Sequence, residues 1–237
     1  MNAIARHLAD LVRIHGRDWF DLETQFCVGS RDTLWYAIAL LYSDEEVERA
    51  LGDRLLGEAS CGDGTHTPAT MLAILLCIPT RISEATADHL DGLVVKSLPD
   101  AAMAEWHDGN VNHPLAAWAT LILGGERHGD TLAVQSGAGR LRMLADTVGN
   151  RRHATHRQAV YSEYNSPTYS ALNLWFLALM AEYTNDQEIR DLALFLEQRL
   201  WVETALFYHA PSQQFSGPHS RAYLDDSLGG WSALHCT

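Results

Sequence analysis

The stretch SEYNSPTYSALNLWF, residues 162–176, joins a cluster of hydrogen-bonding side chains directly to an apolar run. The run continues as far as Ala181 with few polar residues, and its length indicates a helix rather than a strand. A helix that is apolar on all sides must be covered by protein on all sides. The stretch therefore predicts a buried inner helix with polar chemistry at its first turn.

The same order of residues recurs along the chain. An acidic residue, a polar cluster, a proline and an apolar run follow one another at residues 63–68, 108–114 and 163–167. Weaker copies begin at Gly29 and Asp225. Proline suits the first position of a helix, because its missing N–H would have no partner there. We therefore expect the polar residues before each proline to form the helix cap and the loop that leads into it.

Between the apolar runs lie helices of another kind. Residues 44–56 and 187–207 place apolar side chains at helical spacing with charges between them, which is typical of a helix that faces water on one side. The pairs Ser43–Glu46 and Thr184–Gln187 predict capping boxes ahead of these helices. The repeating unit is thus a pair of helices, one buried and one amphipathic.

This pattern predicts an all-α protein. Two architectures repeat helix pairs in this way, the open α-solenoid and the closed α/α toroid, and fully apolar inner helices favour the toroid. We expect residues 1–237 to form a single α/α-toroid domain of about four to five helix hairpins, fewer than a closed ring of this kind requires. The chain is then a partial one that stops at its C-terminus inside an inner helix, an open arc, or a ring completed by another subunit in a homo-oligomer.

Composition narrows the class of protein. The chain has 30 acidic and 17 basic residues, a formal net charge of −13, and a single lysine, Lys96, so it offers no basic stripe for nucleic acid. Its longest apolar runs fall short of the roughly 20 residues of a membrane span. The N-terminal residues 1–19 are amphipathic, unlike a signal peptide. These features predict a cytoplasmic protein without nucleic-acid or membrane partners.

The densest groups of acid–base side chains are the strings EYNSPTY and GPHSRAY. If every loop before an inner helix lies on one face of the toroid, these strings meet around one cavity. Asparagine and arginine can stabilise the enolate formed when a proton is removed next to a carboxylate, while tyrosine or histidine removes that proton. The alternative is ordinary cap and loop hydrogen bonding. The predicted catalytic residues are Tyr164, Asn165, His219, Arg221 and Tyr223.

Further polar residues at equivalent places in the repeats predict substrate contacts. They suit hydrogen bonding to a sugar-like molecule, and their spacing gives no evident set of metal ligands, so we expect neither a metal nor another cofactor. The four cysteines show no CxxC spacing and are expected to be free thiols. The predicted substrate-binding residues are His66, Asp108, Asn112, His113, Glu163 and Tyr169.

The two strings and the helical segment between them resemble a largely uncharacterised family of bacterial and fungal α/α-toroid proteins. The resemblance covers roughly residues 100–237. The strings also resemble, more distantly, toroid polysaccharide lyases, whose sites use asparagine, histidine, tyrosine and arginine. The resemblance implies a toroid fold and a carbohydrate-active enzyme, and it extends to residue types and fold position only.

These observations favour a lyase that eliminates across a uronate-type sugar. In this hypothesis a tyrosine is the base, Asn165 and Arg221 neutralise the carboxylate, and His219 assists the base. The substrate is a small molecule or an oligosaccharide. Three alternatives stay open: a glycoside hydrolase with paired carboxylates, a dehydratase or cyclase of a small terpenoid, and a non-enzymatic helical-repeat binding module.

Overall fold

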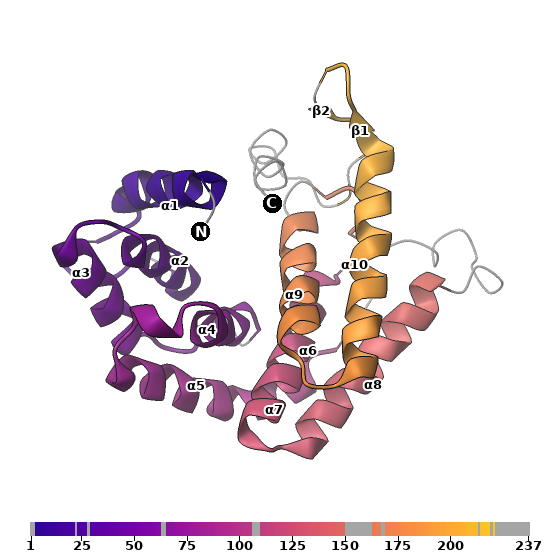
Figure 1. The fold of residues 1–237 in the computed structure, drawn as a ribbon, viewed down its shortest axis with the longest axis horizontal. Helices are drawn as coiled ribbons and strands as arrows, with labels where there is room; N and C mark the ends of the chain where they lie inside the picture. Colours follow the sequence, from indigo (N-terminus) through magenta and orange to yellow (C-terminus); the bar gives the residue numbers. More distant parts are fainter. Residues whose placement is uncertain are drawn as a thin grey trace. The chain divides into compact units, whose positions relative to one another are not determined.

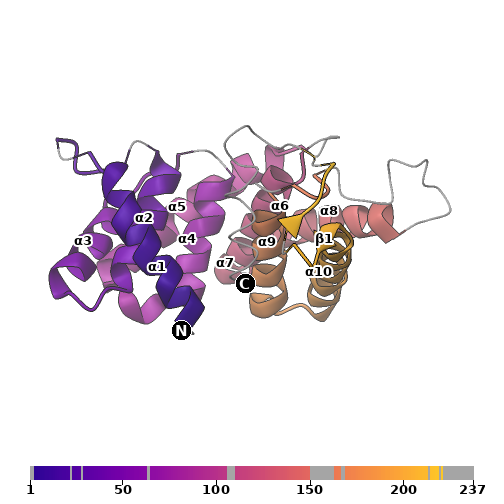
Figure 2. The ribbon, with the colours of Figure 1, turned by 90° about the horizontal axis from the view of Figure 1, so that it is seen from above.

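The computed structural model describes most of the chain (Figures 1 and 2). The described residues are almost entirely helical, which confirms the all-α prediction. Within them, no helix is both long enough and apolar enough to cross a bilayer. The described residues are 3–21, 23–27, 29–62, 65–105, 110–149, 163–166, 169–212, 214–218 and 220.

The chain divides into two compact units, residues 1–101 and residues 102–237. The closed toroid and the single domain stay predictions. Unit 1 contains the helices α1 (Ala3–His15), η1 (Gly16–Asp18), α2 (Ser30–Leu41), α3 (Glu46–Gly57), α4 (His66–Cys77), η2 (Pro79–Arg81) and α5 (Glu84–Met103), the last of which ends just beyond the unit.

Helices of unit 1 alternate between buried and amphipathic, as the sequence predicts. In α4 every residue from His66 to Leu75 is buried. By contrast, Gly52, Leu55 and Leu56 are the buried residues of α3, which packs against α2. Burial of one face of α3 and of nearly all of α4 removes apolar surface from water, and this is the main term that holds the unit together.

Unit 2 repeats the alternation. The helix α6 is buried from Pro114 to its end, and α9 is mostly buried, whereas α8 and α10 each bury a single stripe. Figure 1 shows α9 and α10 lying side by side. The elements of this unit are α6 (Asn112–Ala119), the π-helical turn η3 (Thr120–Gly124), α7 (Gly125–His128), α8 (Thr131–Gly149), α9 (Ser170–Tyr183), α10 (Gln187–Phe207), β1 (Tyr208–His209) and β2 (Gln214–Phe215).

The two described prolines of the repeat do not stand at the first helical position. Pro68 and Pro114 are each the third residue of their helix, because α4 begins at His66 and α6 begins at Asn112. The physical reason is that none of the first few N–H groups of a helix has a partner within the helix, so proline is tolerated there too. Polar residues placed by the sequence in the preceding loop therefore belong to the first turn. The third proline, Pro167, lies outside the described residues.

The two predicted capping boxes are wrong in detail. The N-cap residue of α3 is Glu45, and the hydroxyl of Ser43 accepts the N–H of Glu45. Asp186, not Thr184, caps α10, since its carboxylate accepts hydrogen bonds from the N–H groups of Glu188 and Ile189. Thr184 instead donates to Glu126 of α7 at 2.6 Å. A short polar residue near a helix start can serve either its own helix or a neighbour, and sequence spacing does not separate the two.

A network of charges joins the first helices of unit 1. The carboxylate of Glu48, on α3, lies 3.0 Å from Arg13 of α1 and 3.1 Å from Arg17 of η1, and it accepts the hydroxyl of Ser43 at 2.5 Å. Burial would raise the pKa of Glu48, but the hydrogen bond from Ser43 and the charge of Arg13 outweigh burial, so the pKa is lowered. The network therefore stabilises the position of α1 relative to α3 when Glu48 is ionised.

Replacing Glu48 with glutamine is expected to lower the free energy of unfolding by about 1–3 kcal/mol near neutral pH, because several bonds to a charged group are lost. A group with a lowered pKa stabilises the fold above its unfolded-state pKa, and this stabilisation disappears as the pH falls through the folded-state value. The difference between wild type and Glu48→Gln should thus shrink below about pH 4. Denaturant unfolding across pH measures it.

Arg54→Gln is the matched control, since Arg54 pairs with Glu58 on the exposed face of α3. It should change stability by less than about 0.5 kcal/mol. An equal loss in both variants would contradict the role given to Glu48.

Candidate functional site

The polar segment before α9 reaches the start of α6. The carboxylate of Glu163 accepts the backbone N–H of Asn112 at 2.8 Å and the side-chain amide of Asn112 at 2.6 Å. The amide of Asn173, on α9, lies 3.4 Å from the same carboxylate. All three side chains have no exposed surface. Two of the residues predicted to contact substrate, Glu163 and Asn112, are therefore brought together inside the protein.

This arrangement gives Glu163 the role of a helix cap supplied from another repeat. Asn112 is the first residue of α6, and its N–H is one of those that a helix cannot satisfy internally. A carboxylate at this end also interacts favourably with the positive end of the helix dipole. The geometry thus favours cap hydrogen bonding over substrate binding for Glu163 and Asn112. Asn173, which was not predicted as a site residue, belongs to the same group.

The two motif strings meet through Asn165. Its backbone has a φ of 47°, a left-handed conformation that asparagine tolerates better than most residues. Its side-chain nitrogen donates to the carbonyls of Ser216 at 2.7 Å and Pro218 at 2.9 Å. Both amide hydrogens of this buried side chain are thereby used to hold the segment 216–218.

A backbone hydrogen bond extends the same junction, since the N–H of Ser220 donates to the carbonyl of Tyr164 at 3.2 Å. The half-buried ring of Tyr164 lies 6.1 Å, centroid to centroid, from that of Phe207 at the end of α10. Tyr169 caps the start of α9 and is also half-buried. The described parts of EYNSPTY and GPHSRAY therefore lie together, as the sequence analysis expected of a site.

Two other predicted site residues belong to the first turns of different helices. His66 is buried at the first position of α4 in unit 1, and its carbonyl accepts the hydroxyl of Thr70 at 2.8 Å. His113 is half-buried in the first turn of α6 in unit 2. The remaining predicted site residues fall outside the described part of the chain: Asp108, His219, Arg221 and Tyr223.

Metal-ligand and thiol chemistry have little basis in the described residues. Among them, no group of three or more histidine, cysteine, aspartate or glutamate side chains is placed to hold a metal ion. Burial raises the pKa of the Cys27 and Cys61 thiols, which favours their protonated form. Cys77, at the end of α4, is exposed.

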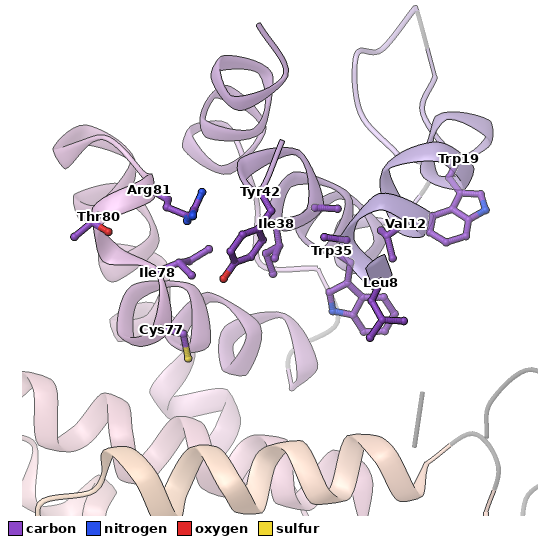
Figure 3. Close-up of a pocket in the computed structure, with 12 residues that line it drawn as sticks. Leu8, Val12, Trp19, Trp35, Ile38, Tyr42, Cys77, Ile78, Thr80 and Arg81 are labelled. Atoms are coloured by element: carbon purple, nitrogen blue, oxygen red, sulfur yellow. The ribbon is translucent and has the colours of Figure 1, made fainter. Parts of the chain in front are cut away.

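Unit 1 contains a pocket of about 530 Å³ that the sequence analysis missed. It is formed by α1, α2 and the segment from the end of α4 through η2, and it is mainly apolar (Figure 3). Its volume lies within the range of small-molecule sites in proteins. The lining residues are Leu8, Ala9, Val12, Trp19, Trp35, Ile38, Ala39, Tyr42, Cys77, Ile78, Thr80 and Arg81.

The one charged side chain among the described lining residues, Arg81, stands at one end of the pocket. Arg81 lies with its guanidinium 4.5 Å from the ring centre of Tyr42 and donates to the carbonyl of Leu41, the last residue of α2, at 2.9 Å. Figure 3 shows Arg81, Thr80 and Cys77 on one side of the pocket and Leu8 and Trp19 on the other. No acidic side chain is among the described residues that line it.

Sequence comparison locates similarity in the second half of the chain. Residues 145–232 match a domain of unknown function (DUF8769), and this segment includes both motif strings. No curated protein and no solved structure matches the chain. The match indicates that both motif strings belong to one recurring domain. The resemblance to lyases rests on the motif strings alone.

Proposed function

We propose that this chain is a non-enzymatic helical-repeat binding module that takes a small, mainly apolar molecule in the pocket of unit 1. The observation that carries the proposal is the pocket itself, with aromatic and aliphatic walls from three segments. Pockets that bury a small ligand have this mixture of apolar walls and few polar groups. The pocket lacks a facing acid–base pair among its described lining residues.

The contacts of the polar clusters support the same proposal. Glu163, Asn112 and Asn165 use their side chains to hold α6, α9 and the segment 216–218 in place. Groups committed to buried structural hydrogen bonds are poor candidates for proton transfer, which requires a free donor or acceptor in reach of substrate.

Binding can be tested with an apolar fluorescent dye, 1-anilinonaphthalene-8-sulfonate, and by the thermal shift that it causes. We expect saturable binding with one site per chain, and a raised melting temperature, because a ligand that binds only the folded state stabilises it. Ala9→Phe, which places a ring in the pocket from α1, should weaken binding at least tenfold. Leu132→Phe, at an exposed position of α8, is the matched control. Binding unaffected by Ala9→Phe would refute the proposal.

A second candidate is the uronate lyase, favoured by the hydrogen bonds that bring EYNSPTY and GPHSRAY together. In this proposal Tyr164 or Tyr223 is the base, His219 assists it, and Arg221 neutralises the substrate carboxylate. Asn165, first predicted to share that neutralisation, supports the site by anchoring the segment 216–218.

The lyase proposal is tested by incubating the protein with oligouronates and following the ultraviolet absorbance of an unsaturated product. Activity should disappear in a variant that combines His219→Ala with Tyr164→Phe and Tyr223→Phe, and activity that survives all three changes would exclude these roles. Release of reducing ends without the absorbance would indicate a hydrolase instead.

A further inference from the structure

The two ends of the unit 1 pocket differ in chemistry. We propose that the pocket binds an elongated apolar molecule carrying one negatively charged head group, with the head group at Arg81 and the apolar body toward α1. This inference rests on the proposed binding function and adds the class of ligand. It concerns residues outside the segment that matches the domain of unknown function.

The apolar end can hold a hydrocarbon or ring system. Leu8 and Val12 come from successive turns of α1, while Trp35 and Ile38 come from α2. Figure 3 shows Trp35 and Leu8 on the side of the pocket away from Arg81. Burying apolar ligand surface against such side chains is favourable in proportion to the area removed from water. This end therefore supplies affinity with little preference for shape.

Arg81 supplies a fixed positive charge at the other end. Its bond to the Leu41 carbonyl uses one of five N–H donors, and its contact with Tyr42 orients the guanidinium plane. It makes no ion pair with any described residue, although the chain as a whole has a net charge of −13. An arginine held in place with donors to spare suits a carboxylate, sulfonate or phosphate head group.

Two neighbouring helix ends oppose an anion at this side of the pocket. The C-terminal ends of α2 and α4 both reach this side of the pocket, and a helix C-terminus carries partial negative charge that disfavours an anion. Without Arg81 the site would repel an anionic head group. Whether the site prefers a negatively charged or a neutral head group should therefore depend on Arg81.

The test compares decanoate with 1-decanol, which share a ten-carbon chain and differ in the charge of the head group. Binding is followed by tryptophan fluorescence and by protection of Cys77 from thiol alkylation, read by peptide mass spectrometry. We expect wild type to bind decanoate about tenfold more tightly than decanol, the effect of one charge-assisted contact. Arg81→Gln should reverse the preference and bind decanol more tightly than decanoate, because the helix C-termini then disfavour the anion, and Arg81→Lys should retain part of the wild-type preference.

Arg54→Gln, which removes an exposed arginine of α3, is the charge-matched control and should keep the wild-type preference. Circular dichroism establishes that each variant is folded. Equal binding of decanoate and decanol to wild type would overturn this inference and leave the apolar binding module intact. If neither compound nor the dye binds, both proposals fail. Concentration-dependent dimerisation that itself protects Cys77 would assign the pocket to a second copy of the chain and overturn the ligand proposal.

Discussion

Replacing Glu163 with alanine is expected to lower the free energy of unfolding of unit 2 by about 3–5 kcal/mol, because it removes a buried charged acceptor from several donors at once. The N–H of Asn112 and the amides of Asn112 and Asn173 would lose their acceptor in a region without exposed surface. The first turn of α6 should then fray. Hydrogen exchange at α6 and denaturant unfolding measure the two effects.

Two variants control this prediction. Glu163→Gln keeps the shape and one carbonyl acceptor, so it should cost less than the alanine variant. Glu182→Ala removes an exposed acid from α9 and should be nearly neutral. If Glu163→Ala proved as mild as Glu182→Ala, the carboxylate would not be the cap described here, and a role in substrate binding would regain support.

Replacing Asn165 with alanine should cost about 2–4 kcal/mol, the second large effect. Two hydrogen bonds to the carbonyls of Ser216 and Pro218 are lost, each worth about 1 kcal/mol, and alanine is strained by about 1–2 kcal/mol at a φ of 47°. The segment 214–218 should become accessible to protease, and limited proteolysis with denaturant unfolding tests this.

Asn165→Gly separates the two contributions, because glycine adopts a positive φ freely and lacks only the hydrogen bonds. It should recover about 1 kcal/mol relative to alanine. Under the lyase proposal, both variants should lose activity in proportion to the loss of order at 214–218. An Asn165→Gly protein that stays fully ordered yet inactive would instead restore Asn165 to direct contact with the substrate carboxylate.

Sequence patterns predicted the helices well, because a buried helix face places apolar residues at helical spacing. The apolar runs at α4 and α6 and the one-sided patterns at α3 and α10 correspond to helices with the expected burial. The run at α9 is also a helix, but it is not covered on all sides, because Trp175 is half-buried and Ala178 is exposed. Helix starts were less accurate, since proline fits several positions of a first turn equally well.

The candidate site was predicted only in part. The spacing of EYNSPTY and GPHSRAY led us to expect their meeting, and the described residues do meet at Asn165. Their chemistry was not predictable, because glutamate and asparagine before a helix look the same whether they bind substrate or cap a neighbour 51 residues away. The unit 1 pocket left no signal, since its walls are ordinary apolar helix positions from segments distant in sequence.

The π-helical turn η3 controls the direction in which the following helix presents its side chains. A residue added within a continuous helix turns everything after it by about 100°, and η3 is such a local widening between α6 and α7. Downstream of it, Glu126 accepts hydrogen bonds from Thr184 and Asn185 in the connection between α9 and α10. Shortening η3 by one residue would therefore leave a regular helix but rotate Glu126 away from that connection. The π-helical turn thus sets the rotation of α7 about the helix axis that lets Glu126 bind the next helix pair.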